Sequence, residues 1–263
     1  MVSERNSQRV FFAVSALLFA GSAAVTIVWC GSMSAMGEME MPGGWTMSMA
    51  WMRMSGQTWA GFAASFLGMW AVMMVAMMLP SLVPMLSHYR QAVGGARETR
   101  LGRLTTLVGV SYFFVWIVIG MSVFPLGIAT AAVAMQRPAL ARSVPIAAGV
   151  VVLIAGALQF TGWKARHLAC CRNEPTRDRV LPSDAVTACR HGLRLGLHCS
   201  ECCFGLIAIL LVVGVMDLRA MAVVAAAITV ERLAPAGALV ARATGAIVVG
   251  AGLFLIAQAA GLG

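Results

Sequence analysis

The chain has 263 residues, of which 60% are hydrophobic and 11% charged, and its mean hydropathy is +0.86. This composition excludes a soluble globular protein and is typical of a polytopic membrane protein. The net charge of +9 raises the question of a nucleic-acid partner. We expect none, because the arginines flank apolar segments and form no separate basic domain.

Seven apolar stretches are long enough to cross about 30 Å of hydrocarbon as helices. They predict an all-α fold, a polytopic transmembrane bundle of about seven helices, as a single domain over residues 1–263. The sixth stretch is short and carries Glu231 and Arg232 near its end, so a bundle of six helices stays an alternative. The predicted helices cover residues 10–30, 58–80, 104–132, 143–161, 195–216, 218–235 and 237–257.

The first stretch has a signal peptide as its alternative interpretation, because Arg5 and Arg9 precede it. Its roughly twenty apolar residues exceed a usual signal core. Trp29 before Cys30 also argues against lipoprotein processing, which requires a small residue at that position. We therefore expect this stretch to be retained as a membrane helix.

The distribution of Lys and Arg predicts the orientation, because positively charged loops tend to stay in the cytoplasm. With the N-terminus inside, fifteen of these residues fall on the cytoplasmic side and four on the other. We expect a multi-pass protein of the bacterial inner (cytoplasmic) membrane, embedded in the lipid bilayer. Residues 31–57 then form a methionine-rich outer loop, and residues 161–192 a basic cytoplasmic loop that contains Cys and His.

Methionine is concentrated between Met33 and Met85, where fourteen of the nineteen methionines lie. Eight of them are in the outer loop. Thioether sulfur is a soft, uncharged ligand that suits Cu(I) and needs no deprotonation, so a ladder of such sites can collect Cu(I) outside and pass it inward. In the second predicted helix the candidate ligands are Met69, Met73 and Met77, spaced by four, with Met74 and Met78 beside them.

Packing is the alternative interpretation of these methionines, because Met is an adaptable filler of irregular helix interfaces. The loop has less core to fill, but it can instead lie on the bilayer surface with Trp45 and Trp51 as anchors. Pro80 and Pro84 follow the helix stripe and are expected to kink or end the helix.

Cysteines form the second group, and all except Cys30 fall on the predicted cytoplasmic side. Four side chains near the start of the fifth predicted helix share an arc of about 140° on a helical wheel. If that helix begins near Leu193, they lie in the inner leaflet. The four are His198, Cys199, Cys202 and Cys203, and the preceding loop adds Cys170, Cys171, Cys189 and His191.

Three interpretations of this cysteine group are preferred over a disulfide framework, which is the least expected because cytoplasmic thiols are normally kept reduced. Binding of a soft metal is preferred, since a helix and a facing loop together offer enough ligands for Cu(I) or for tetrahedral Zn(II). Thiol redox exchange is the second, because Cys199 and Cys202 form a C-x-x-C pair, although the βαβ context of redox domains is absent. Burial as small apolar side chains is the third.

Glu231 is an acid within an apolar stretch, where ionisable groups are costly and usually have a partner. It can orient a metal ligand or relay a proton. Its alternative role is an ion pair with Arg232, Arg242 or Arg194.

Three segments of the chain carry a resemblance to a known family: MWAVMMVAMMLPSLVPML, QFTGWKARHLACCRNEP and GLHCSECCFGLIAILLVVGVMDLRAMAVVAAAITVERLAP. Over roughly residues 60–257 the chain resembles the bacterial family of predicted metal-binding integral membrane proteins. This chain departs from the family pattern at Cys170, at His198 and at Arg232, where lysine is common. The residues that the resemblance carries over are Met73, Met74, Met77, Met78, Pro80, Cys171, Cys199, Cys202, Cys203 and Glu231.

The expected function is the binding, transport or delivery of a soft metal ion, with Cu(I) preferred over Zn(II) or Hg(II). Two further candidate functions are a membrane thiol-disulfide oxidoreductase and a non-catalytic subunit of a larger complex. We expect no enzyme and no ATP-driven pump, because the sequence has no Walker phosphate loop, nucleophile elbow or H-E-x-x-H motif. The expected partner is a metallochaperone or a cuproprotein assembly system. Gly245, Gly250 and Gly252 allow close helix packing, within one chain or between two copies.

Overall fold

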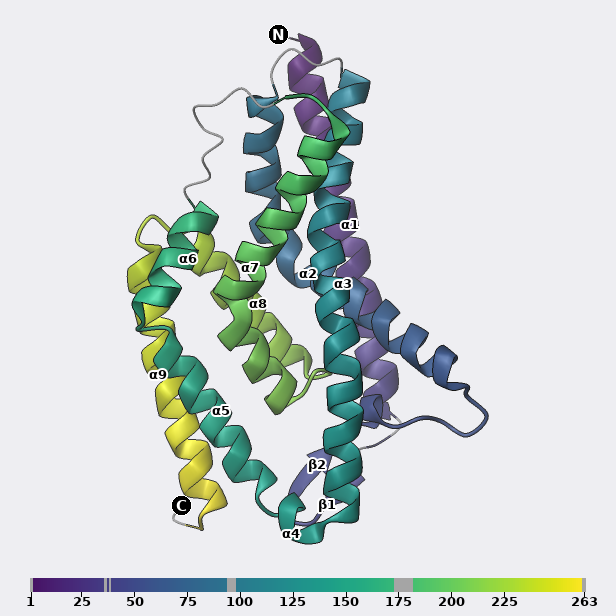
Figure 1. Cartoon of the computed structure of the whole chain (residues 1–263), viewed down its shortest axis with the longest axis vertical. Helices are drawn as coiled ribbons and strands as arrows, with labels where there is room; N and C mark the ends of the chain where they lie inside the picture. The colour runs from purple at the N-terminus through teal and green to yellow at the C-terminus, as the bar shows by residue number, and fades with distance from the viewer. Residues whose placement is uncertain (1, 36, 38, 94–97, 173–181, 262–263) are drawn as a thin grey trace.

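The computed structural model describes residues 2–35, 37, 39–93, 98–172 and 182–261, and it is a bundle of helices with one small β-hairpin (Figure 1). The elements are, in chain order, α1 (Val2–Ala35), β1 (Met39–Met41), β2 (Trp45–Met47), the 3-10 helix η1 (Met49–Trp51), α2 (Trp59–Ala92), α3 (Glu98–Gln136), α4 (Pro138–Ala141), α5 (Val144–Leu158), α6 (Gly162–Arg172), α7 (Ala185–Val213), α8 (Leu218–Leu233) and α9 (Gly237–Ala259). The two strands are antiparallel, with Glu40 opposite Thr46. The all-α prediction is confirmed.

Each of the seven predicted stretches contains a helix, but fewer than seven are long and apolar enough to cross a membrane. Within the described ranges five helices meet that condition: α1 from Arg5, α2, α3, α7 and α9. Helices α5 and α6 meet at a bend of 67° and count as a sixth only when taken as one broken span. Helix α8 has 16 residues, which is short of the roughly 20 that a span needs. The structure therefore fits the alternative of six helices better than seven.

Helix α7 begins much earlier than the hydropathy of its sequence indicates. The Thr187 N–H donates to the Asp184 carboxylate at 2.9 Å, which caps the helix at Ala185 rather than near Leu193 and lowers the pKa of that carboxyl. The predicted loop at 161–192 thus includes α6 and the first two turns of α7, while residues 173–181 lie outside the described part. His198 to Cys203 lie about 20–27 Å along α7, near its middle and not at its start.

Helices α5 and α9 lie side by side, as do α3 and α7 (Figure 1). Glycines make this close approach achievable: a Cβ on Gly252 of α9 would lie 2.7 Å from the Leu153 nitrogen of α5, and one on Gly196 of α7 would lie 2.9 Å from the Tyr112 carbonyl oxygen of α3. Close approach of helix backbones at small residues is typical of membrane bundles. Of the three glycines singled out in the last helix, Gly245 and Gly252 serve packing within the chain, and Gly250 faces open space.

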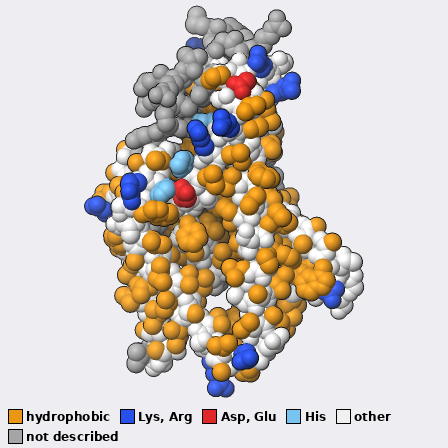
Figure 2. All heavy atoms as spheres, in the orientation of Figure 1, with side chains coloured by type: hydrophobic (Ala, Val, Ile, Leu, Met, Phe, Trp, Pro, Cys, Tyr) orange, Lys and Arg blue, Asp and Glu red, His pale blue; other side chains and the backbone are white. Residues whose placement is uncertain are grey.

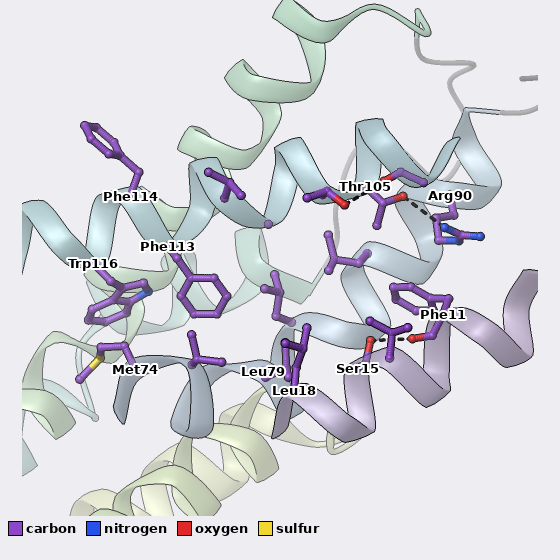
Figure 3. Close-up of a pocket in the computed structure, with 18 of the residues that line it drawn as sticks. Phe11, Ser15, Leu18, Met74, Leu79, Arg90, Thr105, Phe113, Phe114 and Trp116 are labelled. Carbon is purple, nitrogen blue, oxygen red and sulfur yellow. Dashed lines mark hydrogen bonds between the residues drawn. The ribbon is translucent and has the colours of Figure 1, made fainter. Parts of the chain in front are cut away.

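A groove of about 730 Å³ lies between α1, α2 and α3 (Figure 3). Its lining is mainly apolar, with Met74 and Trp116 toward one end and Arg90 at the other. The Arg90 guanidinium donates to the hydroxyls of Ser7 at 2.8 Å and Thr105 at 3.4 Å. The polar groups at that end are therefore satisfied within the protein.

We expect Gly252→Ala to lower the thermal stability of the protein, because its Cβ would press on the α5 backbone. Overpacking of this kind costs about 1–3 kcal/mol. Gly250→Ala is the matched control, since a Cβ there meets no heavy atom within 4 Å. Unfolding temperatures measured in detergent should fall for Gly252→Ala alone, and equal temperatures for the two variants would contradict the α5–α9 contact.

Candidate metal centre

Four cysteine thiols meet in the middle of the bundle, one from α6 and three from α7. Cys199 and Cys203, one turn apart on α7, have their sulfur atoms 4.0 Å from each other. The Cys202 thiol interacts with the thiols of Cys203 and of Cys171 on α6. All four are almost completely buried, with exposed fractions of 0% for Cys199, 3% for Cys202 and 1% each for Cys203 and Cys171. We call these four residues the thiol cluster.

One pair of thiols within the thiol cluster is close enough to ligate a single soft ion. Two sulfur ligands at about 2.3 Å from a metal can be at most about 4.6 Å apart. The 4.0 Å between Cys199 Sγ and Cys203 Sγ lies inside this limit without any movement of the helix. Thiolates select Cu(I) and Zn(II) among the common ions, so the donor set suits the ions that the sequence predicts.

Arg232 of α8 is the central polar group beside these thiols, although only 4% of it is exposed. Its guanidinium donates to Cys199 Sγ at 3.1 Å, to Ser81 Oγ at 3.0 Å and to Met85 Sδ at 3.0 Å. The Tyr112 hydroxyl of α3 also donates to Cys199 Sγ, at 2.9 Å. A sulfur that accepts one charge-assisted and one neutral hydrogen bond is suited to carry negative charge as a thiolate.

Glu231, next to Arg232, pairs with a lysine that the sequence interpretation placed in the cytoplasmic loop. The Lys164 ammonium of α6 donates to the Glu231 carboxylate at 2.7 Å and to the Cys202 carbonyl at 2.8 Å. Both side chains are buried, with 4% and 2% exposed. The expected partners Arg232, Arg242 and Arg194 are thus replaced by Lys164. The bend between α5 and α6 explains the difference, because it turns Lys164 back into the bundle.

His198 lies apart from the thiol cluster, although it is adjacent to Cys199 in the sequence. Its imidazole Nδ1 is 3.5 Å from Glu201 Oε2, and the Nδ1 of His167 on α6 is 2.9 Å from the same oxygen. These three residues, the His–Glu triad, offer ligand atoms within 4.8 Å of one another. Nitrogen and oxygen ligands suit Zn(II) better than Cu(I). His167 and Glu201 were missed as ligands in the sequence, where only their proximity to His198 and Cys170 marks them.

The remaining candidates from the predicted loop also lie outside the thiol cluster. Cys170 is exposed on α6, whereas its neighbour Cys171 is buried. Cys189 and His191 lie near Tyr89 at the end of α2, and the His191 ring stacks on Tyr89 at 5.1 Å. Because His191 precedes Cys199 by eight residues, it is about 12 Å away along α7. Of these four candidates, Cys171 alone reaches the cluster.

The methionines of α2 are all buried in the same hydrophobic core as the thiol cluster. The spacing by four continues beyond the three predicted members to Ser81 and Met85, both of which accept hydrogen bonds from Arg232. This register was the signal that could have identified Met85. Met74 instead lines the groove beside Trp116 (Figure 3). We call Met69, Met73, Met77, Ser81 and Met85 the α2 stripe.

Two further residues of the site were missed in the sequence. Lys164 is the only lysine of the chain, which otherwise uses arginine for every positive side chain. A single lysine in such a chain is itself an indication of a specific role. Tyr112 is one of two tyrosines, and its sequence has no comparable mark, because its role depends on how closely α3 packs on α7 at Gly196.

Comparison with known proteins places the chain in a family. A family model described as PpoB2, copper chaperone, matches residues 67–255. No curated protein and no solved structure matches the chain. The match confirms the metal-related part of the resemblance seen in the sequence and replaces its general metal-binding label with copper. It includes the thiol cluster and the α2 stripe, and it leaves out α1 and the whole methionine-rich loop.

We expect Glu231→Leu and Lys164→Met each to destabilise the protein by about 3–5 kcal/mol, because each leaves the other charge buried and unpaired. The double variant should be more stable than either single variant, since neither charge remains. Reversible unfolding in detergent of the wild type and the three variants gives the coupling energy directly. Losses that simply add in the double variant would show that the pair is not coupled.

Proposed function

Because the chain belongs to the PpoB2 copper chaperone family, we propose that it holds Cu(I) at the thiol cluster inside a membrane and delivers the ion to a copper protein. The observation that carries this proposal is the convergence of four buried thiols from two helices, with Arg232 and Tyr112 directed at one sulfur. Apolar packing alone does not explain this arrangement. A cysteine buried only as a small apolar side chain needs no hydrogen bond from a guanidinium or a hydroxyl group. Copper here is cargo, bound by this chain and passed on.

The charges around the thiol cluster support a singly charged ion. Arg232 and Lys164 are positive and Glu231 is negative, so these three buried groups sum to +1. A net charge in a low-dielectric interior is costly, and one thiolate among the four cysteines neutralises it. Cu(I) held by two thiolates carries the same −1 as that single thiolate. Exchange of one further thiol proton for Cu(I) therefore leaves the buried charge unchanged.

A membrane location is part of the proposal and rests on the surface as well as on the helices. Large apolar side chains cover much of the outer surface, and most of the visible Lys and Arg side chains gather on the upper half, near the N-terminus (Figure 2). Large exposed apolar areas are unfavourable in water and favourable in lipid. With the N-terminus cytoplasmic, this arrangement fits a bacterial inner-membrane protein by the positive-inside rule.

Delivery by this chain is a ligand exchange and involves no catalysis. A partner that presents soft ligands, a cuproprotein under assembly or a metallochaperone, would take Cu(I) from the cysteines. Thiol-disulfide exchange is the weaker alternative, because the attacking sulfur must reach a substrate disulfide and Cys199, Cys202 and Cys203 are buried. Zn(II) remains the competing ion, and the His–Glu triad offers it nitrogen and oxygen ligands.

The variant Cys171→Ser/Cys202→Ser tests the proposal, since it removes one ligand from each of the two helices. Cys170→Ser/Cys189→Ser is the matched control, with the same substitutions on the same two helices but outside the thiol cluster. Competition with a chromophoric Cu(I) chelator, on anaerobically purified full-length protein, should show an affinity loss of about tenfold or more for the first variant. The control should bind as the wild type does. Equal Cu(I) affinities for the two variants would overturn the proposal, as would stronger retention of Zn(II) than of Cu(I).

A further inference from the structure

A cavity of about 150 Å³ near the far end of the α2 stripe is lined by methionine from four parts of the chain. One side chain comes from the end of α1, three from η1 and the loop after it, one from α2 and one from the turn between α7 and α8. Among the described residues, no charged side chain lines it. The six methionines are Met33, Met49, Met52, Met54, Met69 and Met216, and we call them the methionine pocket.

Packing does not explain the methionine pocket, because methionine used as a filler closes space and here six side chains surround it. The cavity has far more room than a single water molecule needs. Met54 is nearly half exposed, so a large part of its side chain gains no free energy from burial. A seventh sulfur stands behind the pocket, where the buried Cys30 thiol donates to Met216 Sδ at 3.8 Å. Methionine is thus the most frequent residue type along this cavity.

The chemistry of this lining selects one class of ligand. Thioethers are soft and neutral, so they bind Cu(I) without releasing a proton. Divalent Zn(II), Ca(II) and Mg(II) prefer carboxylate, carbonyl or imidazole ligands, and the described part of the chain places no carboxylate or imidazole along the cavity. Trp29, Phe62 and Phe66 supply apolar walls, and Gln57 and Ser65 add neutral polar groups.

The methionine pocket is joined to the thiol cluster by a row of side chains that winds around α2. Met69 belongs both to the pocket and to the α2 stripe. The stripe ends at Met85, whose sulfur contacts the same Arg232 that donates to Cys199. Sixteen residues separate Met69 from Met85, which is about 24 Å along a helix. A buried row of side chains on α2 thus extends from the methionine pocket to Arg232, which contacts Cys199 of the thiol cluster.

We propose that the methionine pocket is a second Cu(I) site, distinct from the thiol cluster, which receives the ion at the predicted outer end of the bundle. The inference rests on the proposed function for the identity of the cargo and adds a site to it. Four of the six methionines precede residue 67, so the pocket is built largely from residues outside the family match.

The test compares two triple variants within the same methionine-rich segment. Met49→Leu/Met52→Leu/Met54→Leu removes three sulfurs from the pocket and keeps side chains of similar size. Met39→Leu/Met41→Leu/Met47→Leu is the matched control, because these methionines of the hairpin pack on Ala131, Ala134 and Ala141 instead. Cu(I) competition on the full-length protein is measured at several pH values between about 5.5 and 7.5, where thiol protons compete with the ion.

We expect the wild type to bind Cu(I) in two classes that differ in their response to pH. Affinity at the thiol cluster should change about tenfold per pH unit for each thiol proton displaced, whereas thioether affinity should not change. The pocket variant should lose the pH-independent class and the hairpin variant should keep both. Retention of that class by the pocket variant, its loss in the hairpin variant, or its absence from the wild type would overturn the second site.

The same measurement separates this inference from the proposed function. The variant Cys171→Ser/Cys202→Ser should lose or weaken only the pH-dependent class. If the wild type lacked a pH-dependent class but kept a pH-independent one sensitive to the pocket variant, the thiol cluster would fail as the Cu(I) site and the methionine pocket would stand. If the pocket variant instead kept both classes, the second site would fail and the thiol cluster would stand.

Discussion

Two neighbouring residues of α8, Glu231 and Arg232, bind the centre of this bundle together. Glu231 pairs with Lys164 of α6, while Arg232 donates to side chains of α2 and α7. Both are buried, so each contact forms where water cannot replace it, and loss of a partner leaves a charge uncompensated. Helix α8 is shorter than a membrane span needs, yet it carries the pair that fixes three other helices around the thiols.

Because of this pair, the thiols of the cluster differ in their polar contacts. Arg232 approaches Cys199 from α8 and Tyr112 approaches it from α3, so one sulfur of the four is distinguished from the rest. Lys164 acts on the backbone of α7, at the Cys202 carbonyl, rather than on a sulfur. The polar contacts therefore fix the rotation of α7 about its axis, with Cys199 toward α3 and α8 and Cys202 toward Cys171 of α6.

Much of the fold follows from the sequence, since hydropathy locates the apolar cores of helices reliably. The ends of helices are set by capping and bends instead. At two such ends the structure differs from the prediction, and both differences affect the site. Asp184 starts α7 two turns early, and the bend after α5 converts part of a predicted loop into a wall of the site. The helical wheel placed His198 with the cysteines because it gives angles within one helix. It cannot say which neighbouring helix lies on each side: α6 presents His167 to Glu201, which His198 also contacts, apart from the buried thiols.

The α2 stripe was predicted only in part for a related reason. The prediction selected methionines only, so it stopped at Ser81. The spacing by four continues through Ser81 to Met85. In the structure both side chains accept hydrogen bonds from the Arg232 guanidinium, so they belong to one row by position although their residue types differ. For Lys164, residue type was the useful criterion. Its positive charge led to its prediction in the cytoplasmic loop, but its being the only lysine among arginines was the better indication of a role in the site. Lysine presents a compact charge that fits between a carboxylate and a carbonyl.

The two kinds of sulfur ligand give the proposed path a direction. A thioether binds Cu(I) weakly and independently of pH, while a thiolate binds it strongly and must first lose a proton. An ion that enters at the methionine pocket therefore lowers its free energy by moving toward the thiol cluster, and the reverse step is uphill. Release from the cluster then requires either protons or a partner with more thiolates. The thiols that bind Cu(I) strongly thus also make its release depend on the recipient protein. This dependence distinguishes delivery to a partner from uncontrolled loss of the ion.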